Sequence, residues 1–162
     1  METIITIATV LNMYLGSVQS NNVNYCYNAD IENGTVKSMY VYDTSNESIA
    51  NKLRYEFSYD NEGRLTEKKA YKWNALQREF RPYYRLQFDY TCVGYEVAYS
   101  KWDKAGNDWN EAMEKSIYTF EMDNLVSVNH MRRSSEHKEF RTVDSVLMLN
   151  PTNDIILAEA FH

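Results

Sequence analysis

The 162-residue sequence predicts an all-β fold, an antiparallel meander of about nine or ten strands built from hairpin repeats of roughly 30 residues, with a coiled or rolled sheet. Turn signals recur about every fifteen residues, and apolar and polar residues alternate with period two between them. No stretch after residue 20 has the apolar spacing of an amphipathic helix. Because so short a spacing leaves no room for crossovers, neighbouring strands should pair.

Two series of turns divide the chain. Gly34, Gly63 and Gly94 lie 29 and 31 residues apart, and Asn124 follows 30 residues later. Glycine and asparagine tolerate the positive φ of tight hairpin turns. The second series lies half a period out of phase, at residues 45–47, 74–77, 104–107 and 134–136.

Long strand patterns lie between these turns, at residues 53–60, 64–74, 79–91, 94–103 and 108–122. In each pattern, the residues that point to one side of the strand are mainly aromatic, and those that point to the other side are mainly polar. An uncovered aromatic face of a whole sheet would exceed the apolar patch that a soluble monomer tolerates. We therefore expect Phe57 and Phe88 to be buried, either because the sheet coils upon itself or because a second copy forms a homodimer.

Aromatic residues also recur at one phase of the repeat. Tyr42, Trp73 and Trp102 lie 31 and 29 residues apart, and Phe80 and Trp109 follow the two tryptophans by seven residues. Such cross-strand pairs should clamp the half-period turns. Flat rings can also stack on sugars, so the candidate ligand-binding residues are Tyr42, Trp73, Trp102 and Trp109, with an extracellular glycan or a protein as partner. The alternative is that these rings only cover the sheet and clamp its hairpins.

The N-terminal segment favours export. Residues 4–15 form an uncharged apolar run of twelve, which is too short to span a bilayer and has the length of a signal-peptide core. Val18 and Ser20 suit signal-peptidase cleavage after Ser20, which would leave residues 21–162 as a single β-meander domain in the periplasm, at the cell surface or outside the cell. The acidic Glu2 departs from the signal pattern, and an N-terminal helix or strand that packs on the domain is the alternative.

Charge and composition exclude several classes of partner. The chain has 17 Lys and Arg against 23 Asp and Glu, a net charge of -6, so it should repel nucleic acid. Its three histidines lie at no metal-ligand spacing, and the sequence predicts neither a metal site nor a cofactor. Cys26 and Cys92 either form one disulfide, as an exported protein allows, or remain two buried thiols on strands.

Carboxylate pairs are the first candidates for catalysis. Asp60 with Glu62, or Asp108 with Glu111, could serve a hydrolase that uses two acids. In an acidic protein such residues more often belong to turns and solvated faces.

A nominal nucleophile, base and orienting acid also occur in the sequence, as Ser134, His137 and Asp144. The serine lies in no glycine-flanked elbow between a strand and a helix. We therefore predict no catalytic residue and a non-enzymatic binding module, with a hydrolase or a structural envelope component as alternatives.

Two resemblances follow from the strand and turn patterns. Residues 59–66 (YDNEGRLT) resemble the tyrosine-aspartate (YD) repeat of large bacterial surface and toxin-encapsulating shells, with one strict copy in this chain. Residues 22–140 are similar to a family of small exported proteins of unknown function from Bacteroides-type gut bacteria, through residues 53–55, 66–68 and 72–74 (LRY, TEK and KWN). This second resemblance implies export in a diderm bacterium and a β-rich fold, and it supplies no catalytic residue.

Overall fold

A computed structural model describes residues 5–20, 24–46, 49–122, 125–134 and 139–149. They belong to two compact units. We call residues 5–85 with 102–109 the N-terminal unit, and residues 86–101 with the part of the chain from 110 onward the C-terminal unit.

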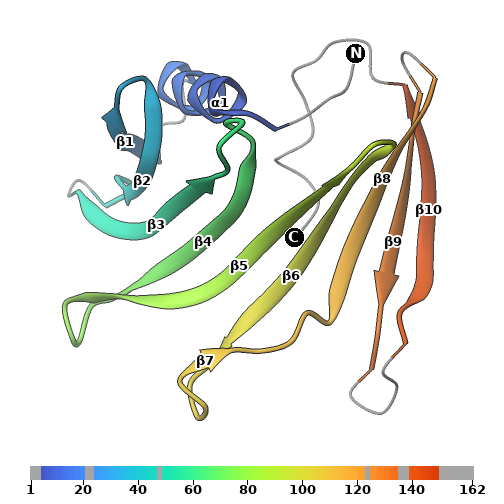
Figure 1. The fold of residues 1–162 in the computed structure, drawn as a ribbon. Helices are drawn as coiled ribbons and strands as arrows, with labels where there is room; N and C mark the ends of the chain where they lie inside the picture. Colours follow the sequence, from blue (N-terminus) through green and yellow to red (C-terminus); the bar gives the residue numbers. More distant parts are fainter. Residues whose placement is uncertain (1–4, 21–23, 47–48, 123–124, 135–138, 150–162) are drawn as a thin grey trace. The chain divides into compact units, whose positions relative to one another are not determined.

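One helix and ten strands make up the described chain (Figure 1). In order they are α1 (Ile7–Gln19), β1 (Tyr25–Glu32), β2 (Thr35–Asp43), β3 (Ala50–Tyr59), β4 (Leu65–Asn74), β5 (Glu79–Thr91), β6 (Gly94–Asp103), β7 (Asp108–Trp109), β8 (Glu114–Met122), β9 (Leu125–Arg132) and β10 (Arg141–Leu149). The strands are hydrogen-bonded in the order β1-β2-β3-β4-β5-β6-β8-β9-β10, and β7 pairs with β6. The predicted all-β antiparallel meander is confirmed.

Four of the five long predicted strands match β3 to β6 within a few residues, but the prediction of one strand over 108–122 is wrong. Residues 110–113 leave the ladder between β7 and β8. Trp102 lies opposite Trp109, and Tyr99 lies opposite Glu114. The two residues of β6 between them, 100 and 101, therefore lie across from four residues, 110–113. This segment contains no glycine or proline, so no turn signal reveals the interruption.

The predicted turns have the expected backbone. Asn33 and Gly34 both have positive φ (50° and 76°), which matches the right-handed twist of the β1–β2 hairpin. The half-period turns end in Arg78 and Asn107, with φ of 53° and 52°, so the same conformation closes both hairpins. The turn at Asn124 and parts of those at 45–47 and 134–136 lie outside the described residues.

The buried apolar side chains come mainly from alternate strand positions. In the N-terminal unit they are Ile5, Val10, Val36, Met39, Val41, Phe57, Leu65 and Ala70, and in the C-terminal unit Leu86, Phe88, Tyr95, Val97, Tyr118 and Val126. Phe57 and Phe88 are each 7% exposed, which confirms that the predicted aromatic side of their strands is the buried one.

The predicted signal segment is helical. Thr6 caps α1 through a reciprocal pair of bonds with Thr9, and the helix packs against β1 and β2. Within the described ranges, no helix is long and apolar enough to cross a membrane. Cleavage after Ser20 stays a prediction.

Both cysteines are free thiols. Cys26 is half-buried on β1, but Cys92 is exposed, so its expected burial on a strand is wrong. Cys92 lies in the turn that follows β5, where the side chain points away from the core.

Candidate functional site

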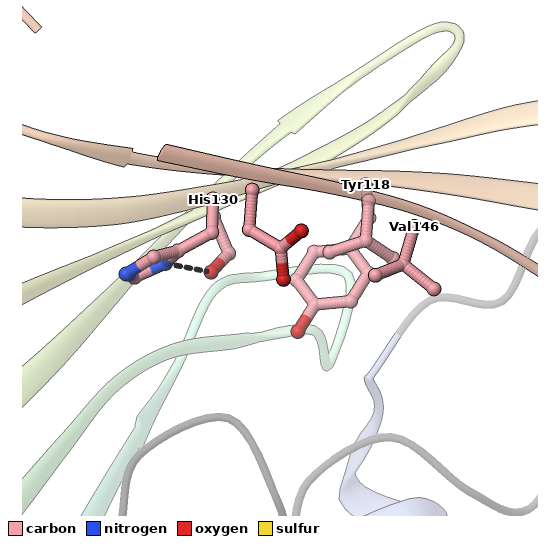
Figure 2. Close-up of a pocket in the computed structure, with 6 residues that line it drawn as sticks. Tyr118, His130 and Val146 are labelled. Carbon is pink, nitrogen blue, oxygen red and sulfur yellow. Dashed lines mark hydrogen bonds between the residues drawn. The ribbon is translucent and has the colours of Figure 1, made fainter. Parts of the chain in front are cut away.

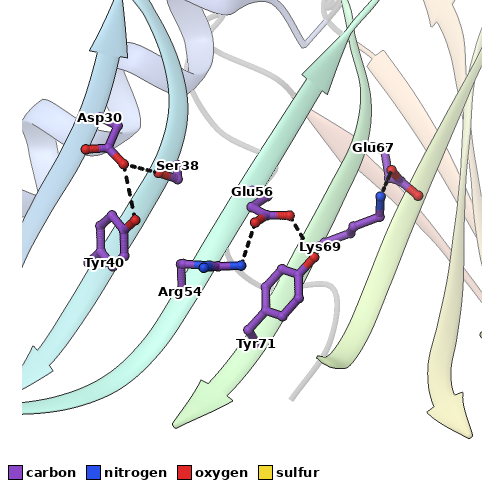
Figure 3. A network of polar contacts seen from close by, with 8 residues as sticks. All are labelled: Asp30, Ser38, Tyr40, Arg54, Glu56, Glu67, Lys69 and Tyr71. Atoms are coloured by element: carbon purple, nitrogen blue, oxygen red, sulfur yellow. Dashed lines mark hydrogen bonds and ion pairs between the residues drawn. The ribbon is translucent and has the colours of Figure 1, made fainter. Parts of the chain in front are cut away.

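Polar and aromatic side chains share one face of strands β2 to β4. Tyr40 lies opposite Arg54, which in turn lies opposite Tyr71. Because directly opposed residues of antiparallel strands point to the same side, these three form one row across the sheet. The neighbouring row contains Ser38, Glu56 and Lys69 (Figure 3).

Four rings are in contact on this side of the N-terminal unit. Tyr40 stacks on Tyr42 with centroids 6.5 Å apart, and Phe80 meets Tyr40 edge-on at 6.3 Å. Trp73 packs edge-on against Phe80 at 5.0 Å. All four are half-buried, so part of each ring remains accessible. We call the following set the aromatic face: Tyr40, Tyr42, Arg54, Tyr71, Trp73 and Phe80.

Arg54 holds the centre of the aromatic face. Its guanidinium carbon lies 4.5 Å from the centroid of the Tyr71 ring and 5.5 Å from that of Phe80. One nitrogen donates to Glu56 at 2.6 Å, and the Tyr71 hydroxyl donates to the other Glu56 oxygen at 2.7 Å. Burial and the Glu56 carboxylate raise the pKa of Tyr71 to about 12, so this hydroxyl keeps its proton at neutral pH.

Two further carboxylates extend the network on either side of Glu56 (Figure 3). Asp30 accepts from Ser38 at 2.6 Å and from the Tyr40 hydroxyl at 3.2 Å. Glu67 pairs with Lys69 at 2.8 Å. Each of these charged groups is therefore held in a fixed orientation by a hydrogen bond or ion pair to a neighbour.

The other two predicted site residues form a separate pair. Trp102 meets Trp109 edge-on at 5.0 Å, and the Arg85 guanidinium lies 5.4 Å from the Trp109 ring. Arg85 is also 3.8 Å from Glu67, which connects this pair to the charged network. The clamp prediction is confirmed for both hairpins, through the Trp73–Phe80 and Trp102–Trp109 pairs. A ligand-binding role for Tyr42, Trp73, Trp102 and Trp109 stays a prediction.

Three residues of this site, Arg54, Tyr71 and Glu56, are not among those that the sequence predicts. The alternation of β3 does indicate where two of them point, because it places Arg54 and Glu56 on the side of the strand opposite Tyr55 and Phe57. The alternation does not give the register of β2, β3 and β4, and only that register brings Arg54 and Glu56 beside Tyr40 and Tyr71.

The candidate catalytic carboxylates have local roles. Asp60 accepts the backbone N–H groups of Glu62 and Arg64 and the Arg64 side chain, and these bonds, chiefly the Arg64 backbone bond, hold the pKa of Asp60 below its usual value. Asp108 accepts the N–H of Trp109, and Glu111 pairs with Arg133 at 2.7 Å. These contacts close turns and join loops.

The nominal set of Ser134, His137 and Asp144 is not tested by the structure. His137 lies outside the described residues, and Ser134 is exposed. Instead Ser116, His130 and Asp144 form one cross-strand row on β8, β9 and β10. With Tyr118, Val128 and Val146 they line a pocket of about 270 Å³ in the C-terminal unit (Figure 2).

In this pocket a serine and a histidine are hydrogen-bonded, but no backbone N–H groups beside Ser116 are free to stabilise an oxyanion, as acyl transfer requires. Ser116 Oγ lies 3.2 Å from His130 Nδ1, and Glu114 lies 4.0 Å from His130 Nε2. Ser116 is the third residue of β8, whose backbone pairs there with β6 on one side and β9 on the other. Its neighbouring N–H groups therefore serve the sheet and are not aimed at an oxyanion. The part of the chain that is described also contains no group of three or more His, Cys, Asp or Glu placed to hold a metal.

Comparison with known proteins gives a family and a fold. A family model described as "Family of unknown function (DUF3836)" matches residues 1–120. The crystal structure of a protein with unknown function from Bacteroides fragilis is 20% identical, with a TM-score of 0.69 over 79% of this chain and 94% of that chain. No curated protein matches the chain.

Two solved structures of members of the matched family are also similar. The one from Bacteroides vulgatus is 24% identical, with a TM-score of 0.53 over 55% of this chain and 91% of that chain. The one from Parabacteroides distasonis is 26% identical, with a TM-score of 0.51 over 69% of this chain and 91% of that chain. The resemblance to a family of unknown function from Bacteroides-type bacteria is confirmed.

Proposed function

The chain belongs to the DUF3836 family, whose function is unknown, and we propose that it is a non-enzymatic binding module whose aromatic face takes a glycan. The observation that carries this proposal is the contact series Tyr42, Tyr40, Phe80 and Trp73, in which half-buried rings adjoin a fixed set of charged groups. Rings left partly open on a surface, with polar groups held between them, are suited to ligand recognition.

The chemistry of a sugar ring matches this arrangement. Its C–H faces are apolar and can lie on Trp73 or Tyr42, while its hydroxyl edges need both donors and acceptors. The network offers the Arg54 guanidinium as donor and the Asp30 and Glu56 carboxylates as acceptors. These side chains are already oriented by their mutual bonds, so little side-chain entropy is lost when a sugar binds.

Charge distribution favours a glycan over a protein partner. The cores of protein interfaces are depleted of charged side chains. On this face Arg54 lies between Tyr40 and Tyr71 in one central row, and the neighbouring row contains the charged Glu56 and Lys69. A protein that docked here would have to desolvate all of them.

Export forms part of the same proposal. The apolar run at residues 4–15 supports delivery to the periplasm, the cell surface or the medium, where glycans are encountered. N-terminal sequencing of the protein recovered outside the cytoplasm should give Asn21 as the first residue. An intact Met1 in that fraction would contradict the cleavage.

A glycan array tests the binding proposal. The wild-type chain should bind at least one glycan class, and Trp73→Ala should weaken that binding at least tenfold because it removes a stacking surface. Tyr83→Ala is the matched control, since Tyr83 is an exposed ring on β5 outside the aromatic face. Wild-type binding that survives Trp73→Ala and Tyr42→Ala unchanged would contradict the assignment, as would the absence of binding to any glycan.

A further inference from the structure

The N-terminal segment occupies a two-part seat on the N-terminal unit. Its first part is a short extended stretch. Ile5 O accepts the N–H of Leu65 at 2.7 Å, and Ile7 N–H donates to Gly63 O at 3.0 Å. Thr6 thereby forms an antiparallel bridge with Arg64, next to the start of β4. Main-chain bonds of this kind depend little on the side chains of the segment that makes them.

The second part of the seat receives a helix. α1 contacts β1 and β2, and Val10 on its inner side is 2% exposed. Ile7 fits beside Gly63, where a Cβ atom would lie 3.3 Å from the Ile7 Cδ1 atom. Gly63 therefore leaves the space that the isoleucine side chain uses.

The outer side of the helix differs from the inner side. Leu15 is 44% exposed and Val18 is 50% exposed, and α1 contains no charged residue. The seat thus requires a helix with an apolar, uncharged stripe on its inner side and places little demand on the outer side.

Removal of this segment would uncover apolar surface. Ile5 and Val10 of the segment are 4% and 2% exposed, so the rest of the unit covers them, and Leu65, the backbone partner of Ile5, is completely buried. Cleavage after Ser20, which is part of the proposed function, would take away both the bridge and the helix. A vacated apolar surface of this kind is typical of an interaction site.

We propose that the seat of residues 5–19 is a peptide-docking site, filled in the precursor by the chain's own N-terminal segment and in the processed protein by a peptide with an extended lead-in and a helix whose inner side is apolar and uncharged. The seated segment itself shows the chemistry of the occupant. This recognition combines strand addition at Gly63–Leu65 with a helix laid on an apolar surface. It is separate from the aromatic face and depends on the proposed function only for the cleavage that empties the seat.

Full-length variants test the docking site without reliance on cleavage. Val10→Asp places a charge on the buried side of α1 and should release the helix, whereas Leu15→Asp changes the exposed side and should leave it seated. A fluorescent peptide of residues 5–20 should then bind the Val10→Asp chain at least tenfold more tightly than the Leu15→Asp chain. Equal binding to both folded variants, or none to either, would overturn the proposal.

Peptide variants and processed protein complete the test if Val10→Asp fails to fold. Processed protein that begins at Asn21 should bind the wild-type peptide and the peptide with Leu15→Asp, and it should bind the peptide with Val10→Asp at least tenfold more weakly. Loss of this distinction would overturn the docking site even if export is confirmed. An unprocessed N-terminus would refute the cleavage alone, because the full-length variants would still decide the docking site.

Discussion

Two tyrosine stacks show how the same ring contact can belong to a surface or to a core. Tyr40 and Tyr42 lie on one strand of the N-terminal unit, with centroids 6.5 Å apart, and both are half-buried. Tyr95 and Tyr118 face each other on β6 and β8 of the C-terminal unit at 4.6 Å, and they are 2% and 4% exposed.

The hydroxyl groups make the difference clear. Tyr40 donates to Asp30, whereas the Tyr95 hydroxyl is buried and has no hydrogen-bond partner among the described residues. Burial raises the pKa of both Tyr95 and Tyr118. In the core stack the rings stabilise the fold through packing, whereas burial of the Tyr95 hydroxyl lowers the free energy of unfolding. Aromatic content alone therefore does not identify a binding surface, and the proposed surface rests instead on half-exposed rings with polar partners.

The largest expected effect comes from Gly94→Ala, which would force β6 and β8 apart at the core stack. A Cβ atom at Gly94 would lie only 1.8 Å from the backbone oxygen of Tyr118, and backbone cannot move aside as a flexible side chain can. We expect a loss of about 4 kcal/mol or more in the free energy of unfolding, measured in urea. Gly16→Ala in α1 is the control, since nothing lies within 4 Å of its added Cβ, and it should be neutral or stabilising. Equal stability of the two variants would contradict the close approach.

Ring removal should separate the two stacks directly. Tyr95→Ala should cost about 3 to 4 kcal/mol because it leaves a cavity in the core of the C-terminal unit. Tyr42→Ala should cost about 1 kcal/mol or less, since its ring is only half-buried. Chemical unfolding of both variants measures this contrast, and a similar loss in the two would remove the distinction between core and surface.

Lys68, which has no carboxylate partner among the described residues, sharpens the comparison with the paired Arg54. The Lys68 ammonium lies 4.2 Å from the Tyr55 ring centroid, and desolvation by burial lowers the pKa of Lys68 to about 8. The unfolded chain then binds more protons than the folded chain between this value and the ordinary lysine pKa of 10.5. Stability should consequently rise between about pH 8 and pH 10, by on the order of 2 kcal/mol.

Lys68→Met should remove most of this rise while it keeps the apolar stem in place. Thermal or urea unfolding across the pH range gives the measurement. Above about pH 10 the effect should reverse, because burial raises the pKa of Tyr59 and Tyr71 to about 12 and the unfolded chain loses those protons first. A wild-type stability that falls steadily from pH 8 would contradict the desolvated state of Lys68.

The smallest expected effects come from removal of single hydroxyl groups. Tyr95→Phe should leave stability unchanged or raise it by about 1 kcal/mol, because the buried hydroxyl has no partner in the part of the chain that the structure describes. Tyr40→Phe should lower stability by about 0.5 kcal/mol through loss of its bond to Asp30. Unfolding curves in which Tyr95→Phe is clearly destabilised would show that its hydroxyl is satisfied.

The sequence predicted the meander because the alternation within the strands and the turn residues between them indicated the same elements. The alternation along residues 53–60 and the turn at Gly63 determine strand and hairpin together, and both appear as predicted. The break at residues 110–113 was missed because it depends on Arg133, whose backbone N–H and side chain bond to the carbonyls of Met113 and Ala112. That contact joins residues about twenty positions apart and leaves no local signal.

The candidate site was predictable only in part. The 29- to 31-residue recurrence selected Tyr42 and Trp73, and it predicted both aromatic clamps. It could not supply Arg54 or Glu56, because their place beside Tyr71 follows from the register of β3 with β4. For the same reason the row of Ser116, His130 and Asp144 was invisible until three strands were aligned.

Glycan binding by the aromatic face can be observed through the indole N–H signals of the three tryptophans. Single Trp→Phe variants assign the signals of Trp73, Trp102 and Trp109, and the strongest glycan from the array is then titrated into the wild-type chain by NMR. We predict a saturable shift of the Trp73 signal, with the binding constant measured independently by calorimetry. Saturable binding that leaves all three indole signals unmoved would place the ligand elsewhere and contradict the claim.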